Sequence, residues 1–237
     1  MRNFRPDPLA PGTLEALVAA AQSAATSSNL QTWSVVAVEN PERKAAASVL
    51  SGDQAFIRDA PLFLVFCADL SRLTRVAAAV GSPDAGLDYL EMFLVAVIDA
   101  ALAAQNAAVA AEGMGLGICY VGGARNQPRA MAELLALPPR VFAVFGLAVG
   151  QIAEGDTSPV KPRLPQSAVL HREKYDIEQG SAVAGYDAAM RRFYDAQKRA
   201  VKGDWSQHSA RRIATAAALG GRDDLRAVLV ELGFALR

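Results

Sequence analysis

The sequence is poor in the residues that hold metals and disulfides. It has two cysteines and two histidines in 237 residues. Cys67 and Cys119 both lie in apolar runs and are far apart in sequence, which indicates buried thiols in a reducing compartment and excludes a disulfide framework. Because His171 and His208 are the only histidines, we expect no His/Cys metal site.

Net charge is also lacking. Lys+Arg and Asp+Glu balance at 24 each, so no overall field would draw the chain to nucleic acid or to an anionic membrane. No basic segment followed by an apolar core and a cleavage site precedes Asp7, and we therefore expect a cytoplasmic protein. Hydrophobic residues make up 52%, enough for a sizeable core in one large domain or two small ones.

The longest apolar run lies within Leu87–Asn126. Between Glu91 and Glu112 the only charge is Asp99, and alanines recur on every side. A helix that is apolar all round is expected to be buried all round. Its length of about twenty residues also fits a membrane span, but an Asp at the bilayer centre costs about 2.5–3.5 kcal/mol, which favours a core helix. The alanines favour close approach of another helix, as in a subunit interface; a core helix within one subunit is the alternative.

Glycines follow this helix. The cluster at 113–117 is expected to end it, and Ile118–Val121 is typical of a short strand. The Gly-x-Gly-x-Gly pattern is not a dinucleotide fingerprint, because that motif follows a strand and opens a helix. Gly122 and Gly123 then offer a backbone without side chains, which a flat or anionic ligand can approach closely.

Apolar periodicity predicts alternating helices and strands. The runs at 62–68 and 141–150 are continuously apolar, which is typical of central strands covered on both faces. We therefore predict a layered α/β or α+β fold in which helices sandwich a sheet. The other predicted strands are 33–38 and 118–121, and the predicted helices are 13–25, 41–50, 127–137, 184–202, 207–219 and 223–232.

Three polar segments each allow two interpretations. Met1–Pro8 is either a solvated terminus or part of a site. Thr26–Gln31 is either a turn that satisfies its own backbone or a set of small donors and acceptors for a polar planar ligand. Lys161–Pro165 is either a solvated basic turn or a preset anion clamp, in which proline lowers the entropy cost of holding two cations on a phosphate.

These segments resemble the FMN-dependent nitroreductase and flavin-reductase family, and most closely its major oxygen-insensitive NADPH nitroreductase type. The resemblance is strong over about residues 1–176 and weaker in the tail. The matching motifs are Ala25–Gln31, Gly52-Asp53-Gln54, Ala104–Ala107 with Gly115-Leu116-Gly117, Tyr120–Asn126, Phe145-Gly146-Leu147, Lys161–Pro165, and in the tail Trp205-Ser206-x-His208 with Arg211-Arg212.

The resemblance implies an α+β sandwich that forms an intertwined homodimer through the long central helix, with FMN at the subunit interface. It assigns residues 1–176 to an FMN-binding domain and residues 177–237 to a helical C-terminal extension that packs on the body or on the partner subunit. It implies no protein catalytic residue and no metal. The implied FMN-binding residues are Arg2, Thr26, Ser27, Ser28, Gln54, Gly122, Gly123, Lys161 and Arg163. The residues implied for the substrate or NADPH are Glu91, Arg125, Lys198, Arg199 and Lys202.

The implied activity is ping-pong hydride transfer from NADPH, or NADH, through FMN to nitroaromatics, quinones or similar electron-poor acceptors. A flavin reductase that supplies reduced FMN and a catalytically silent flavin-binding dimer are the alternatives. The family typically begins with a His-x-Ser-x-Arg-like segment, and the chain starts just after its first residues. Either translation starts upstream, or we expect weaker retention of FMN.

Overall fold

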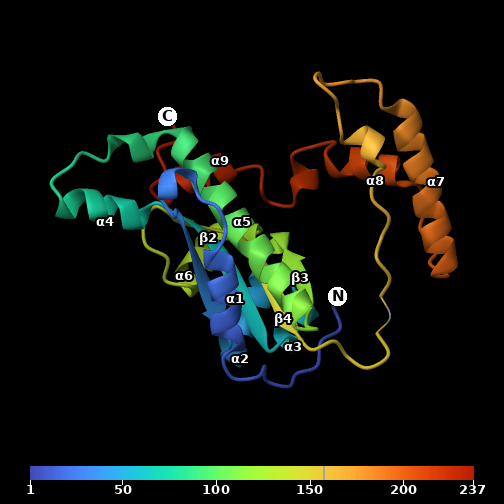
Figure 1. Cartoon of the computed structure of the whole chain (residues 1–237), viewed down its shortest axis with the longest axis horizontal. Helices are drawn as coiled ribbons and strands as arrows, with labels where there is room; N and C mark the ends of the chain where they lie inside the picture. Colours follow the sequence, from blue (N-terminus) through green and yellow to red (C-terminus); the bar gives the residue numbers. More distant parts are fainter. Residues whose placement is uncertain (157) are drawn as a thin grey trace. The chain divides into compact units, whose positions relative to one another are not determined.

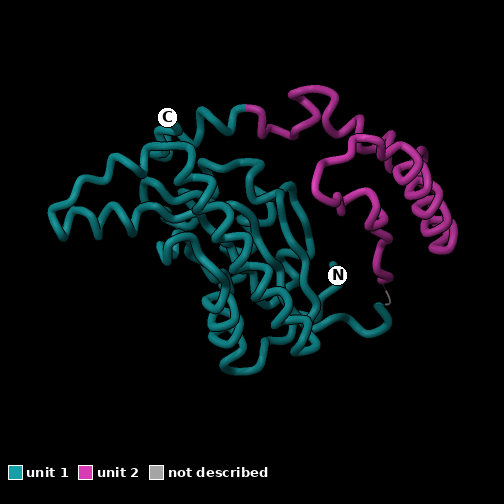
Figure 2. Tube along the Cα trace, turned by 45° about the horizontal axis from the view of Figure 1, so that its top comes forward, with its two compact units in different colours: residues 1–156, 224–237 teal, residues 157–223 magenta. Residues whose placement is uncertain are grey.

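The computed structural model describes residues 1–156 and 158–237 and forms two compact units (Figure 2). Unit 1 consists of residues 1–156 and 224–237, and unit 2 consists of residues 157–223. The domain boundary expected after residue 176 stays a prediction. In the compact units, residues 158–176 group with the helices that follow them, and residues 224–237 return to unit 1.

Unit 1 is built on a four-stranded antiparallel sheet of strand order β1-β2-β4-β3. The strands are β1 (Trp33–Val38), β2 (Leu62–Asp69), β3 (Gly117–Val121) and β4 (Val141–Gly150). Every residue of β2 is buried, and β2 and β4 occupy the centre of the sheet. The two continuously apolar runs are therefore central strands, as predicted.

Helices cover both faces of this sheet (Figure 1). Leu64 and Phe66 of β2 point to the layer of α1 (Thr13–Gln22) and α5 (Leu90–Gly113). Val65 and Cys67 point to the opposite layer, since successive strand residues alternate between faces. That second layer contains α2 (Pro41–Leu50), α3 (Ala55–Asp59) and α6 (Pro128–Leu134). The predicted α+β sandwich is confirmed.

Within a single chain the long helix is buried on its inner face only. Its inner face is almost entirely alanine, from Ala96 to Ala111, and this lets α1 and the sheet approach closely. The outer face is bulkier. Side chains spaced mainly four residues apart form one stripe and are 43 to 58% exposed. We call this the α5 stripe; it consists of Leu90, Leu94, Ile98, Leu102 and Val109.

Within the described residues, α5 is also the one helix long and apolar enough to cross a membrane by length and composition, with a mean hydropathy of 1.8. Its inner face is packed against the sheet, and Asp99 in its middle is 2% exposed with hydrogen bonds to Thr26 and Thr32. A core helix of a water-soluble fold has these properties, as the sequence favoured.

The N-terminal segment packs on unit 1. Phe4 is buried and forms an isolated β-bridge with Ile152, two residues after the end of β4. The Met1 ammonium donates to the Ile118 carbonyl at 3.0 Å. The interpretation of this segment as a solvated terminus was therefore wrong, because Phe4 contributes to the core beneath α3.

Unit 2 contains α7 (Gly180–Ala196) and α8 (Trp205–Arg212). The helix predicted over 184–202 ends earlier, where Lys198 adopts a left-handed φ of 52°. The helix predicted over 207–219 ends at Arg212, and the Thr215 hydroxyl accepts a hydrogen bond from the Ala218 N–H, which offers the backbone an alternative to the helix. The remaining elements are α4 (Ser71–Ala79) and α9 (Leu225–Glu231) of unit 1 and the short 3-10 turns η1 (Ser27–Asn29), η2 (Ala85–Asp88), η3 (Gly122–Arg125), η4 (Gln166–Ala168) and η5 (Ala217–Leu219).

Candidate functional site

The glycine pair after β3 forms a tightly packed backbone corner. Gly123 lies in η3 and is buried. A Cβ at this position would lie 2.3 Å from the carbonyl oxygen of Ser51 and 2.8 Å from Nε2 of Gln54. The Gln54 amide itself donates to the Ser51 carbonyl at 2.8 Å. Glycine is therefore required here for close approach, and the Gln54 side chain is held beside the backbone of the pair.

Two further features belong to the same layer. The Arg2 guanidinium lies over the ring of Phe56, 5.3 Å from its centroid, and Phe56 is the second residue of α3, two residues after Gln54. Ser51 Oγ is buried and has no hydrogen-bond partner among the described residues. The structure thus brings Arg2, Gln54 and the Gly122–Gly123 pair into the α2–α3–η3 layer. We call this group the glycine corner.

The polar turn Thr26–Gln31 belongs to the other layer. The Thr26 hydroxyl donates to Asp99 of α5 at 2.6 Å and accepts from the Gln31 N–H at 2.9 Å. The only proton of the Thr26 hydroxyl is therefore already used in a hydrogen bond within the chain. Ser27 and Ser28, in contrast, are exposed.

The backbone of this turn is left-handed at three residues that are not glycine. The φ angles of Ser28, Asn29 and Gln31 are 49°, 56° and 53°. Such a conformation costs an L-residue roughly 1–2 kcal/mol. The surrounding contacts must therefore offset this cost.

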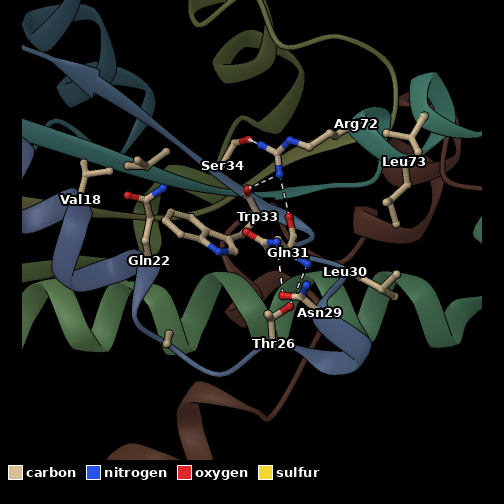
Figure 3. Close-up of a pocket in the computed structure, with 13 residues that line it drawn as sticks. Val18, Gln22, Thr26, Asn29, Leu30, Gln31, Trp33, Ser34, Arg72 and Leu73 are labelled. Carbon is tan, nitrogen blue, oxygen red and sulfur yellow. Dashed lines mark hydrogen bonds between the residues drawn. The ribbon is translucent and has the colours of Figure 1, made fainter. Parts of the chain in front are cut away.

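A cavity of about 590 Å³ lies beside the turn (Figure 3). Thr26 and Gln31 line it together with Trp33 of β1 and Arg72 of α4. The Arg72 guanidinium donates to the carbonyls of Gln31 at 2.7 Å and Trp33 at 3.2 Å and to Ser34 Oγ at 2.8 Å, and it forms an ion pair with Asp69 at 3.4 Å. Sequence reasoning missed Arg72, because nothing in the pattern after β2 indicates that it returns to the turn.

Two residues predicted for substrate or NADPH also lie in unit 1. The Arg125 guanidinium donates to the main-chain carbonyl of Val144 in β4 and is partly buried. Glu91 lies in the first turn of α5 and is exposed. Both assignments stay predictions.

The predicted phosphate-binding cations lie in unit 2. Lys161 and Arg163 are exposed. Arg163 donates to the Lys161 carbonyl at 2.9 Å, and the Tyr186 hydroxyl of α7 donates to the Pro162 carbonyl at 3.0 Å. The Lys161 ammonium lies 5.9 Å from the ring centroid of Tyr194. The segment between the two cations is therefore fixed to α7, which favours a preset pair of charges over a loosely solvated turn.

The basic tail residues lie around the end of α7. Arg199 lines a cavity of about 300 Å³ in unit 2 together with Arg191, Tyr194 and Asp204. Lys198 and Lys202 are exposed, and the Lys202 carbonyl is hydrogen-bonded to His208 Nε2 at 2.8 Å. The structure thus groups Lys198, Arg199 and Lys202 at one end of one helix.

Comparison with known proteins agrees with this fold and these motifs. The profile of the nitroreductase family matches residues 1–151, and that of the nitroreductase family C-terminal domain matches residues 161–237. The chain belongs to the nitroreductase family.

Named relatives cover most of the chain. An FMN reductase (NADPH) of Bacillus subtilis is 46% identical over 178 residues, 75% of this chain and 71% of the relative. An oxygen-insensitive NADPH nitroreductase of Salmonella typhimurium is 36% identical over 214 residues, 90% of this chain and 86% of the relative. The solved structure of NfrA2 of B. megaterium superposes with a TM-score of 0.94 at 38% identity, covering 100% of this chain and 94% of the other.

Proposed function

We propose that this protein is an FMN-dependent NAD(P)H oxidoreductase that works as a cytoplasmic homodimer and reduces nitroaromatics, quinones or similar electron-poor compounds. The glycine corner carries the proposal. Its backbone at Gly122 and Gly123 is free of side chains, and Gln54 is held beside it by the Ser51 carbonyl. Relatives named as an FMN reductase (NADPH) and an NADPH nitroreductase support the same activity.

The residues of the chain fit FMN in chemistry. A planar ring needs flat backbone and amide groups, which the glycine corner offers, and Ser51 Oγ, which has no partner in the described part of the chain, lies in the same layer. A phosphate needs cations in a fixed arrangement, which Lys161 and Arg163 on the α7-bound segment offer. When bound, FMN supplies the hydride acceptance and donation that no side chain of this chain can supply.

The work of the protein is then binding and orientation. Hydrogen-bond donors near a ring that gains negative charge stabilise the reduced form, and Gln54 and the glycine backbone are donors of this kind. Stacking of nicotinamide and acceptor in turn on one exposed face needs positioning but no protein nucleophile. The exposed cations Lys198, Arg199 and Lys202 suit the 2′-phosphate of NADPH, with Arg125 and Glu91 as further contacts.

The homodimer explains two features of unit 1. The α5 stripe is a row of large apolar side chains in water, and contiguous exposed apolar surface is typical of interaction sites. The predicted flavin contacts of unit 1 also fall into two layers, with Thr26–Ser28 beside α5 and the glycine corner on the opposite face of the sheet. A flavin site at the subunit interface would use both groups, with Thr26–Ser28 from one subunit and the glycine corner from the other.

The experiment is anaerobic titration of the purified, FMN-loaded protein with NADPH. We expect the flavin absorbance bands to bleach, and to return when a quinone or a nitroaromatic compound is added. If the bands bleach and only added free FMN restores them, the result would favour the flavin reductase. FMN binding without any bleaching by NADPH or NADH would favour the silent flavin-binding dimer and would contradict the proposed activity.

A further inference from the structure

Hydrogen bonds to one carboxylate, that of Asp99 in α5, hold the polar turn against the core helix. Asp99 Oδ2 accepts three hydrogen bonds, from the Thr26 hydroxyl at 2.6 Å, from the Thr32 N–H at 2.9 Å and from the Thr32 hydroxyl at 2.9 Å. Thr26 is the first residue of the turn, and Thr32 directly follows its last residue. A single buried group on α5 therefore holds both ends of the turn.

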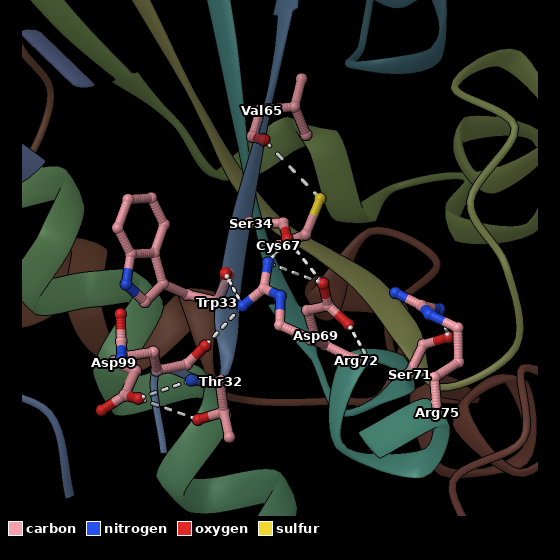
Figure 4. A network of polar contacts seen from close by, with 11 residues as sticks. Thr32, Trp33, Ser34, Val65, Cys67, Asp69, Ser71, Arg72, Arg75 and Asp99 are labelled. Atoms are coloured by element: carbon pink, nitrogen blue, oxygen red, sulfur yellow. Dashed lines mark hydrogen bonds and ion pairs between the residues drawn. The ribbon is translucent and has the colours of Figure 1, made fainter. Parts of the chain in front are cut away.

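A second contact holds the last residue of the turn. The Gln31 N–H donates to Thr26 Oγ1 at 2.9 Å, and the Gln31 carbonyl accepts from the Arg72 guanidinium at 2.7 Å. Arg72 also contacts Trp33 and Ser34, so that the network runs from α5 across the start of β1 to α4 (Figure 4). The turn is closed on both sides by groups that do not belong to it.

The turn needs these hydrogen bonds because its backbone conformation is sterically unfavourable. Ser28, Asn29 and Gln31 all have left-handed φ angles, and residues with a Cβ seldom adopt them without external contacts. Removal of the Asp99 carboxylate would take away three hydrogen bonds that hold the two ends of this turn. The apparent dissociation constant of a ligand rises in inverse proportion to the fraction of molecules in the binding conformation.

We propose that Asp99 is a positioning residue for flavin binding: its carboxylate keeps the Thr26–Gln31 turn in the left-handed conformation in which Ser27 and Ser28 face the ligand. The inference rests on the proposed FMN site, since it names the group that shapes one half of that site. Asp99 does not contact the ligand itself, because it is 2% exposed and Oδ2 is used by the threonines.

The test is the FMN dissociation constant of apo-protein variants, measured by quenching of flavin fluorescence, beside their melting temperatures. Asp99→Ala is expected to raise the dissociation constant at least 10-fold, the result when the binding conformation falls to a tenth of its population. Asp99→Asn keeps an acceptor of the same shape and should recover most of this loss. Ala100→Gly is the matched control: it destabilises the same helix next to Asp99 but leaves the turn contacts in place, so its dissociation constant should stay within about twofold.

A suppressor separates positioning from general stability. In the Asp99→Ala background, Gln31→Gly removes the steric cost of a left-handed residue and should lower the dissociation constant at least threefold. If Asp99→Ala does not fold, Thr32→Val keeps the shape of a buried residue, removes one donor to Asp99, and is still expected to raise the dissociation constant about threefold.

The outcomes are distinguishable. An FMN affinity that follows the melting temperature equally in Asp99→Ala and Ala100→Gly, with no rescue by Gln31→Gly, would overturn the inference and leave the proposed function intact. Failure of the unmodified protein to bind FMN at all would instead overturn the proposed function, and the inference with it.

Discussion

The side-chain amide of Gln54 and the backbone of Gly123 are packed so closely that no Cβ fits between them. The gap from Gln54 Nε2 to an ideal Cβ on residue 123 would be 2.8 Å, and the Ser51 carbonyl would be nearer still, at 2.3 Å. The Gly123 backbone and the Gln54 side-chain amide are therefore in direct contact, although about seventy residues separate them in the sequence. The first prediction follows from this contact.

Gly123→Ala should displace Gln54 or the end of α2. Overpacking of this kind typically costs about 1–3 kcal/mol of unfolding free energy, and we expect FMN affinity to fall with it. Urea unfolding and fluorescence titration measure the two effects. Gly113→Ala is the control, because a Cβ there meets nothing within 4 Å. Equal behaviour of the two variants would contradict the close packing at Gly123.

Arg163→Ala should weaken FMN binding about 10-fold or more, on the order of one lost charged hydrogen bond. The physical reason is that Arg163 and Lys161 are expected to share the phosphate charge from one proline-fixed segment. Arg192→Ala, which removes another exposed cation of unit 2, is the control. Unchanged affinity in a fluorescence titration would remove Arg163 from the site.

Ile98→Glu should break the proposed homodimer. Ile98 is 55% exposed in the middle of the α5 stripe, and an unpaired charge at the centre of a dimer interface is costly to desolvate. We expect the dimer dissociation constant to rise at least 100-fold, as judged by light scattering after size-exclusion chromatography over a range of concentrations. Val49→Glu is the control, because it places the same charge at an equally exposed position on α2, in the opposite layer and away from the α5 stripe. A monomeric unmodified protein would contradict the prediction outright.

Cys67 should make the fold sensitive to alkaline pH. Burial, with a smaller contribution from Asp69, raises the pKa of the Cys67 thiol to about 12 from an ordinary value of 9.0. A thiol whose pKa is raised by folding contributes its stabilisation fully below pH 9, and this contribution is lost as the pH rises from about 9 towards 12.

We expect the unfolding free energy of the native sequence to fall between pH 9 and pH 10 relative to that of Cys67→Ala, with a slope approaching about 1.4 kcal/mol per pH unit. Urea unfolding at a series of pH values measures the difference. Tyr120, whose pKa burial also raises to about 12 from 10.0, is present in both proteins and cancels. Parallel pH profiles for the two proteins would mean that Cys67 is not protected by the fold.

The layered fold could be predicted closely because it depends on local pattern. The helix at Pro41–Leu50 and the strand at Trp33–Val38 lie where the sequence placed them, since apolar periodicity and the proline at the helix start are encoded within each segment. The tail was predicted less well. Its helices end at a left-handed Lys198 and at the Thr215 turn, features that leave little trace in hydrophobic periodicity.

Some residues of the candidate site could likewise be predicted from local motifs, and others could not. Motifs alone pointed to Gly122–Gly123 and to Thr26–Ser28, but not to Arg72, because its partners lie about forty residues away. The alanines of α5 suggested approach by another subunit, whereas they pack inside unit 1 and the larger Leu and Ile side chains face outwards.

The sequence by itself determined the alternation of helices and strands, the central position of two strands and the family, because each depends on residue order over short spans or on motifs. Only the tertiary structure decided which side of α5 is covered, why residue 123 must be glycine and what Asp99 holds. Those properties arise from contacts between residues separated by about seventy positions or more, and such contacts exist only once the sheet and its two helical layers have packed.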